Sequence, residues 1–288
     1  MNSQSYYKDI TNNDAIRKVY QTGSNLDAKY ELERKYGIQK QPFEEWVIPQ
    51  LTLIGSEKVL DVGCGQGRFL LPIARFCKGK GGHLIGCDIA EGVMHSARIT
   101  SERERLPIDF VLADAVELPF LDGYFDLVMA NHMLYHVSDI PKALHEISRV
   151  LKRGGQFLAT TNSQNSMSEL GNLHMQTMRV LGIPYPADRE QSSFSIKNAV
   201  EQLGSVFDSV EPLIIDSGFC VTEPSPVLSY YIATQLYQVP FNNPDILQDR
   251  RTQIVSTFRQ LTAEAICANG GTLTISKLVG AFICKKGS

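Results

Sequence analysis

The sequence predicts an α/β protein with a doubly wound, mostly parallel sheet of seven strands and additional helices around it. Three observations predict this fold. Short apolar segments alternate with amphipathic segments between residues 58 and 162. A turn with glycine at every second position follows the first apolar segment, and an acidic residue ends each of the next two. Strands that alternate with helices form parallel sheets with right-handed crossovers.

The first half of the sheet can be followed element by element. Each apolar segment is short and apolar on both faces, as in strands buried between two layers of helices. Gly, Asn and Asp separate the segments and mark the turns. The expected strands cover residues 58–63, 83–89, 108–114, 125–131 and 154–162, and the expected helices cover residues 67–77, 90–104 and 139–151.

The remaining chain is more helical. Helix-like spacing of apolar residues predicts helices over residues 13–21, 26–37 and 43–53, so residues 1–55 form an expected N-terminal helical cap. The expected main domain, residues 56–288, contains helical insertions near 163–205 and 225–240. Two late strands complete the sheet. The expected elements are helices over 166–183, 195–207, 224–239 and 243–271 and strands over 209–222 and 273–286.

Composition limits the function classes. The chain has 288 residues, of which 43% are hydrophobic, and a net charge of -3, which argues against broad nucleic-acid binding. The six cysteines form no CxxC pair and the six histidines show no ligand spacing with them, so no metal site is expected. The N-terminus is polar, and the apolar runs are far shorter than the ~20 residues of a membrane helix. We expect a soluble, cytoplasmic protein without membrane partners.

The glycine turn, "DVGCGQG", follows the first strand. A dinucleotide-binding turn has the pattern G-x-G-x-x-G, but Arg68 stands at the position of its third glycine. A phosphate-binding P-loop requires Gly-Lys-Ser/Thr, which does not follow. Asp61 opens the turn, and a carboxylate there repels a pyrophosphate but attracts an ammonium group. The turn therefore favours a cofactor with a cationic end.

The pattern D-x-G-x-G-x-G at a first strand resembles motif I of the Rossmann-like (class I) S-adenosylmethionine-dependent methyltransferases, of the small-molecule type. The resemblance implies that the turn lies against the amino-acid part of S-adenosylmethionine. It also implies that the acid after the second strand binds both ribose hydroxyls, and that the acid after the third strand binds the adenine amino group. The implied cofactor-binding residues are Asp61, Gly63, Cys64, Gly65, Gly67, Asp88, Ile89, Asp114 and Ala115.

Two further segments carry the resemblance. "FDLVMANHMLYHV" ends the fourth strand in a form frequent in the family, and "ISRVLKRGGQFL" leads into the fifth strand, with Arg153 where the family often has proline. The likeness covers residues 55–162 closely and is looser elsewhere. Each of these residues has an alternative role that does not depend on the resemblance. The glycines can simply form a tight turn, Asp88 can be the N-cap of a helix, and Asp114 can be an acidic residue of a turn.

Four other residues are candidates for cofactor contact. Met94 lies one turn into the second helix, where it packs either on the adenine or in the core. Asn131 ends the fourth strand near the expected methionine end of the cofactor. Tyr20 and Tyr30 belong to N-terminal helices that cover the cofactor in related enzymes, and aromatic faces attract cations such as sulfonium. Core packing is the alternative for both tyrosines.

The segment after the fourth strand is expected to face the methyl group. Methyl transfer is a displacement at a sulfonium carbon, so the enzyme must align the acceptor and, for a protonated acceptor, supply a base. His132 and His136 are the candidate bases, with capping or packing of the next helix as the alternative for His136. Tyr135 and Tyr7 are candidate substrate contacts.

These patterns predict an enzyme that transfers a methyl group from S-adenosylmethionine to N, O or C of a small molecule. A lid for the substrate is expected from residues 1–36, from 165–200 and from the segment between Phe219 and Tyr231. The alternatives are a nucleic-acid or protein methyltransferase and a non-catalytic module that binds the cofactor. The sequence leaves the acceptor, the acceptor atom and the oligomeric state open.

Overall fold

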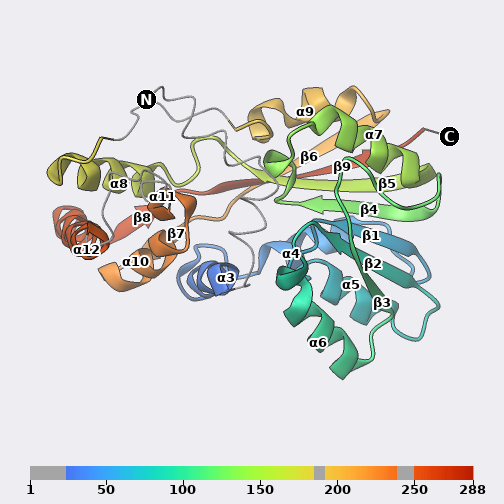
Figure 1. Cartoon of the computed structure of the whole chain (residues 1–288), viewed down its shortest axis with the longest axis horizontal. Helices are drawn as coiled ribbons and strands as arrows, with labels where there is room; N and C mark the ends of the chain where they lie inside the picture. Colours follow the sequence, from blue (N-terminus) through green and yellow to red (C-terminus); the bar gives the residue numbers. More distant parts are fainter. Residues whose placement is uncertain (1–23, 185–191, 239–249, 288) are drawn as a thin grey trace.

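The computed structural model describes residues 24–184, 192–238 and 250–287. A seven-stranded sheet with strand order β3-β2-β1-β4-β5-β9-β6 runs through it (Figure 1). All pairs from β3 to β5 are parallel, and β9 is antiparallel to both β5 and β6. The predicted doubly wound, mostly parallel sheet is therefore confirmed. Its strands are β1 Lys58–Val62, β2 His83–Asp88, β3 Ile108–Leu112, β4 Phe125–Asn131, β5 Leu151–Asn162, β6 Ser209–Asp216 and β9 Leu278–Lys285.

Helices cover both faces of the sheet. Neighbouring strand residues point to opposite faces, so Leu60 packs in one buried cluster and Val59 in the other. The first cluster lies under α7 and α9, and the second under α4 and α5. The helices of this half are α4 Phe43–Val47, α5 Leu70–Cys77, α6 His95–Glu104, α7 Ile140–Val150 and α9 Ile196–Gly204.

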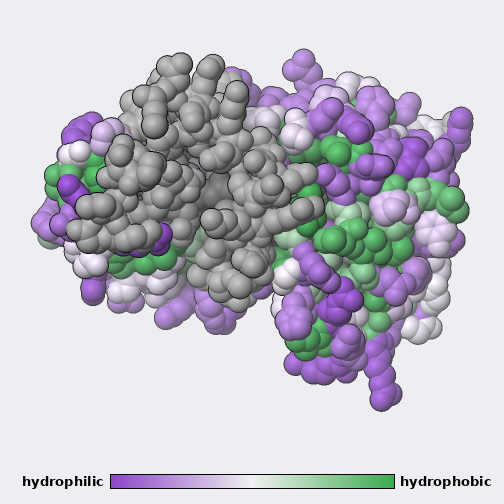
Figure 2. All heavy atoms as spheres, viewed as in Figure 1, coloured by the Kyte–Doolittle hydropathy of each residue, from purple (hydrophilic) through white to green (hydrophobic). Residues whose placement is uncertain are grey.

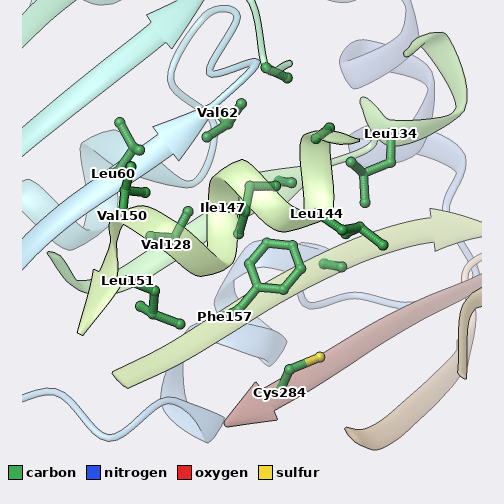
Figure 3. Packing of buried hydrophobic residues seen from close by; sticks show 14 of the residues in the cluster. Leu60, Val62, Val128, Leu134, Leu144, Ile147, Val150, Leu151, Phe157 and Cys284 are labelled. Carbon is green, nitrogen blue, oxygen red and sulfur yellow. The ribbon is translucent and has the colours of Figure 1, made fainter. Parts of the chain in front are cut away.

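Helix α7 illustrates why the layers form. The Asp139 carboxylate accepts the Lys142 backbone N–H at 3.0 Å and caps the first turn, with Pro141 in that turn. The buried residues of the helix follow the spacing of one helical face and pack on β1, β4 and β5 (Figure 3). They are Ile140, Ala143, Leu144, Ile147 and Val150.

A second unit, which we call the helical cap, consists of residues 24–37, 167–184, 219–238 and 250–275. It differs from the N-terminal cap expected over residues 1–55, since it includes later segments and since α4 packs on the sheet. Its apolar residues form a separate buried cluster, in which Tyr231 stacks on Phe258 with ring centroids 3.8 Å apart. The expected N-terminal helix α3 is part of this cap and packs beside α10 (Figure 1). The cap comprises α3 Ser24–Tyr36, α8 Ser168–Val180, α10 Pro224–Ile232, α11 Gln235–Gln238, α12 Arg250–Ala268, β7 Phe219–Val221 and β8 Leu273–Ile275.

The two late strands differ from the sequence expectation, because each is divided in two. After β6 the chain turns at Ser217 and Gly218, where the Gly218 N–H donates to Asp216 at 3.0 Å, and continues as β7 in the cap. Between β8 and β9 it turns at Ser276 and Lys277. The strands β7 and β8 pair with each other, so the chain leaves the central sheet and returns to it. The helix expected over 224–239 is likewise divided into α10 and α11.

Hydrophilic side chains cover most of the described surface on the face shown in Figure 2, with smaller apolar areas among them. Within the described ranges, no helix combines the length and the apolar character needed to cross a membrane.

Candidate functional site

A cavity of about 500 Å³ lies where β1, β2, β4 and β5 end, and residues of the helical cap form its other wall. Ligands of open parallel sheets bind at the carboxyl ends of strands, so this is the expected place. Eleven of the residues assigned from the sequence line the cavity at the sheet edge: Asp61, Gly63, Cys64, Gly65, Asp88, Ile89, Asp114, Ala115, Asn131, His132 and His136. Tyr30 and Tyr135 line it as well.

The glycine turn requires its glycines. Gly63, Gly65 and Gly67 have φ of 67°, 51° and 77°, which L side chains rarely adopt. A Cβ at Gly63 would lie 2.8 Å from the Met133 side chain. Gly67 itself is not among the lining residues, and its N–H closes the turn on the Cys64 carbonyl at 2.8 Å. Gly63 and Gly65 therefore present backbone to the cavity, and Gly67 shapes the turn.

Cys64 lines the cavity, but its side chain is buried. Burial and the nearby Asp61 and Asp88 carboxylates raise the pKa of the Cys64 thiol well above its ordinary value. A thiol in this state is a poor nucleophile, which agrees with a backbone role for this residue.

Asp88 connects the glycine turn to the end of β2. One carboxylate oxygen accepts the Gly65 N–H at 3.0 Å, and the other accepts the Ala90 N–H at 3.0 Å. Burial raises the pKa of Asp88, although the two N–H donors oppose this effect. A carboxylate oxygen can accept more than one hydrogen bond, so Asp88 can hold the turn and still bind ligand hydroxyls.

Asp61 is only 2% exposed and accepts the Asn131 amide N–H at 3.3 Å. Burial, with the nearby Asp88 charge, raises the pKa of Asp61 to about 8. The Asn131 Oδ1 atom is also buried, and it has no hydrogen-bond partner among the described residues. A buried carboxylate and a buried amide oxygen at one cavity wall fit the ammonium group of an amino acid, which donates hydrogen bonds to both.

The adenine end expected from the sequence contains Asp114 and Ala115. The Asp114 carboxylate accepts the Val116 N–H at 3.1 Å and Ala115 is buried, while both residues line the cavity. Met94 is buried in the core at 1% exposure and is not among the lining residues, whereas its neighbour Val93 is. The structure thus offers Val93 as the apolar contact on this wall.

His132 has an unusual backbone for a non-glycine residue, with φ of 54°. Its N–H donates to both the carbonyl and the hydroxyl oxygen of Thr160, each at 3.1 Å, and its ring lies 5.9 Å from Phe43. His136 ends the short 3-10 helix Leu134–His136, and its ring meets the Tyr135 ring edge-on at 4.6 Å. Both histidines line the cavity from the loop after β4.

Several lining residues were not assigned individually to the site from the sequence, although Glu33, Met167 and Tyr230 lie within the expected lid segments. Glu33 on α3, Arg68 after the turn and Lys277 before β9 meet at the cap wall. Their separation along the chain reaches 244 positions, so no local pattern could find them. The end of β5 and the cap add a further group, namely Asn162, Ser163, Gln164, Ser166, Met167 and Tyr230. Tyr7 and Tyr20, predicted from the sequence, lie outside the described residues.

Comparison with known proteins supports the same class. Residues 60–159 match the family model described as "Methyltransferase domain". The ubiquinone/menaquinone biosynthesis C-methyltransferase UbiE of Vibrio cholerae is 28% identical over 173 residues, which are 58% of this chain and 66% of the relative. The malonyl-[acyl-carrier protein] O-methyltransferase of Serratia marcescens is 27% identical over 169 residues, with 58% and 60% covered. The chain thus spans less than two thirds of both relatives.

Among solved structures, the YcgJ protein of Bacillus subtilis matches with a TM-score of 0.55 and 19% identity, over 85% of this chain and 98% of that one. A likeness at this identity concerns the fold. Residues 60–159 are thus a methyltransferase domain, and the fold is Rossmann-like. The matched domain, the relatives and the glycine turn support similarity to the class I S-adenosylmethionine-dependent methyltransferases.

Proposed function

We propose that this protein binds S-adenosylmethionine in the cavity and transfers its methyl group to N, O or C of a small-molecule acceptor. The observation that carries the proposal is the composition of the sheet edge. A glycine turn exposes its backbone there, and two acids, the buried Asp61 and the half-buried Asp88, lie at the ends of β1 and β2. The matched methyltransferase domain supports the choice of cofactor.

The residues present fit this cofactor. The Asp61 carboxylate and the Asn131 amide oxygen would accept the ammonium N–H groups of the methionine part. Asp88 would accept the ribose hydroxyls while it continues to hold the Gly65 N–H. Asp114 would bind the adenine amino group, and Val93 would contact the ring.

The bound cofactor supplies an electrophilic methyl group on a sulfonium, whose leaving thioether is neutral. The protein must therefore align the acceptor behind the methyl carbon, exclude water and remove a proton where the acceptor carries one. His136 and His132 follow β4 and face the cavity, which suits the role of base. Tyr135 lies beside His136 and would contact the acceptor.

Two observations favour a small acceptor. The helical cap contributes Tyr30, Met167 and Tyr230 to the cavity, so the space beyond the sheet edge has a second wall. The names of the two relatives are those of C- and O-methyltransferases of ubiquinone/menaquinone biosynthesis and of malonyl-[acyl-carrier protein]. We therefore include quinone precursors and acyl thioesters among the acceptors to be tested.

The test is incubation of the protein with S-adenosylmethionine that is labelled in its methyl group and with fractions of a cell extract. The proposal expects label in the small-molecule fraction and release of S-adenosylhomocysteine, both reduced in Asp88→Ala when the cofactor concentration is limiting. Label in the RNA or protein fraction would point to a polymer substrate. Cofactor binding without turnover in every fraction would point to a non-catalytic binding module.

A further inference from the structure

The wall of the cavity on the side of the helical cap contains two positively charged side chains. Arg68 and Lys277 are the lysine and arginine residues among the described residues that line the cavity. Their side chains are 21% and 10% exposed, so both charges are largely removed from water. Arg68 follows the glycine turn directly, and Lys277 lies in the turn between β8 and β9, outside the matched domain at residues 60–159.

Glutamates keep these two cations in place. Glu33 on α3 pairs with Lys277 through one carboxylate oxygen and with the Arg68 Nη1 atom through the other, at 3.0 Å for the latter. Glu44 on α4 accepts the Arg68 Nε–H at 2.7 Å. The Arg68 guanidinium also lies over the Tyr30 ring, 4.5 Å from its centroid. We call these five residues the charged wall.

The charged wall retains hydrogen-bonding capacity toward the cavity. A guanidinium carries five N–H groups and an ammonium three. Arg68 donates N–H groups to Glu33, Glu44 and Tyr30, and Lys277 donates one to Glu33. Both residues line the cavity, so an anionic ligand bound there can accept charge-assisted hydrogen bonds from the remaining N–H groups.

The opposite wall has the reverse preference. Asp88 and Asp114 line it and would repel a carboxylate, as would Asp61 in its ionised form. Asp61 has Asn131 and Asp88 as its electrostatic neighbours, whereas Arg68 has Glu33, Glu44 and Tyr30. The cavity therefore has an acidic side and a side with available cationic donors. This arrangement matches a zwitterion whose ammonium and carboxylate point in different directions.

We propose that Lys277 and Arg68 bind the carboxylate of the cofactor's methionine part, and that Glu33 is a positioning residue that holds both cations and draws α3 over the cavity. The inference rests on the proposed function. A carboxylate on the acceptor would satisfy the same donors, so the test must separate the two sources.

The experiment measures dissociation constants by calorimetry for two ligands. One is S-adenosylhomocysteine, and the other is the analogue in which 3-aminopropanethiol replaces homocysteine, so that only the carboxylate is missing. The wild type should bind S-adenosylhomocysteine at least about 10-fold more tightly than the analogue, as charged hydrogen bonds allow. Lys277→Met should remove most of this preference, because S-adenosylhomocysteine weakens and the analogue does not. Lys277→Arg should restore part of it.

The analogue controls for folding, since its affinity reports whether the rest of the cavity is intact. Lys285→Met, on the exposed end of β9, is the matched control and should leave both affinities unchanged. Equal weakening of both ligands in Lys277→Met would mean that Lys277 is only structural and would overturn the proposal. An unchanged preference would assign the donors to another anion, such as the acceptor's, and would also overturn it. Binding of neither ligand to the wild type would instead refute the proposed function.

Discussion

The sheet edge and the helical cap form the two walls of one cavity, but they are built in different ways. The sheet edge takes most of its polar residues from one stretch, residues 61–136, and a few more from the end of β5. The helical cap takes its residues from four separate segments, which meet around one buried cluster. The residues of the sheet edge are thus encoded locally, whereas the opposite wall depends on long-range packing.

The two walls also differ in charge. The sheet edge carries three aspartates, while the cap wall pairs glutamates with Arg68 and Lys277. If the comparison is right, changes in the core of the cap should alter mainly stability. Changes at Asp88 should alter cofactor affinity, and changes at His136 should alter the rate of methyl transfer. The following variants test this separation, in order of decreasing expected effect.

The largest effect is expected from a change in the buried core of the cap, which tests whether the cap and the sheet unfold separately. Phe258→Ala removes the ring that stacks on Tyr231, and both residues are fully buried. A loss of this kind costs about 3–5 kcal/mol. We expect faster hydrogen exchange in α8, α10 and α12 and little change in β1, β4 and β5. Equal acceleration in the sheet would mean that the cap and the sheet unfold as one unit. Phe258→Leu, which keeps part of the volume, is the milder control.

Glu33 should make the stability of the protein sensitive to acid. Burial alone would raise the pKa of Glu33, but the Lys277 and Arg68 charges outweigh this and lower it from 4.5 to about 2. The stabilisation is therefore present above pH 4.5 and is lost as the pH falls toward 2, by about 3 kcal/mol. Denaturant unfolding at several pH values between 4.5 and 2 should show the free energy of unfolding falling with pH. We call this dependence the acid slope.

Two variants check that the acid slope comes from Glu33. Glu33→Gln should flatten it, because no carboxylate remains to be protonated. Glu45→Gln, an exposed neighbour on α4, should retain it. A Glu33→Gln protein with the wild-type slope would place the acid sensitivity elsewhere.

A His136 variant distinguishes an effect on the rate of methyl transfer from an effect on cofactor affinity. If it is the base, His136→Ala should slow methyl transfer about 10²-fold, or about 2.7 kcal/mol, and leave cofactor affinity unchanged. Single-turnover rates and calorimetry measure the two quantities. Full activity would make His136 structural. His132→Asn, which tolerates the positive φ of that position, tests the second candidate without imposing new backbone strain.

Asp88 should have a smaller effect that is confined to the cofactor. Asp88→Ala removes the acceptor of the Gly65 and Ala90 N–H groups and of the expected ribose hydroxyls. We expect affinity for S-adenosylhomocysteine to fall by about 1–3 kcal/mol. Asp109→Ala on β3 lies outside the lining residues and serves as the control. Unchanged affinity in Asp88→Ala would remove this residue from the site.

The same division explains how much the sequence could predict. The central strands and the glycine turn follow from local patterns, since apolar runs, glycine spacing and the acids after the strands lie within a few residues of one another. Within this stretch, Met94 shows the limit of spacing arguments, because Val93 and Met94 are both buried in the same cluster and only Val93 also lines the cavity.

The helices of the cap were also predicted from their spacing, but the way in which they assemble with β7 and β8 into one unit was not. Residues 209–222 and 273–286 were each predicted as one strand, because the interruptions at Ser217 and Ser276, where the chain leaves the sheet, are short. The small residues Ser217 and Gly218 were the available signal. The pairing of Glu33 with Lys277 joins positions 244 residues apart and depends on the finished fold.

The most direct test of the central claim is calorimetry with S-adenosylhomocysteine and NAD on the same preparation. Asp61 at the turn and Arg68 in place of a third glycine favour a cationic amino-acid group over a pyrophosphate. The account predicts that S-adenosylhomocysteine binds with one site per chain and that NAD gives no comparable binding. Tight NAD binding, with no heat from S-adenosylhomocysteine, would contradict it.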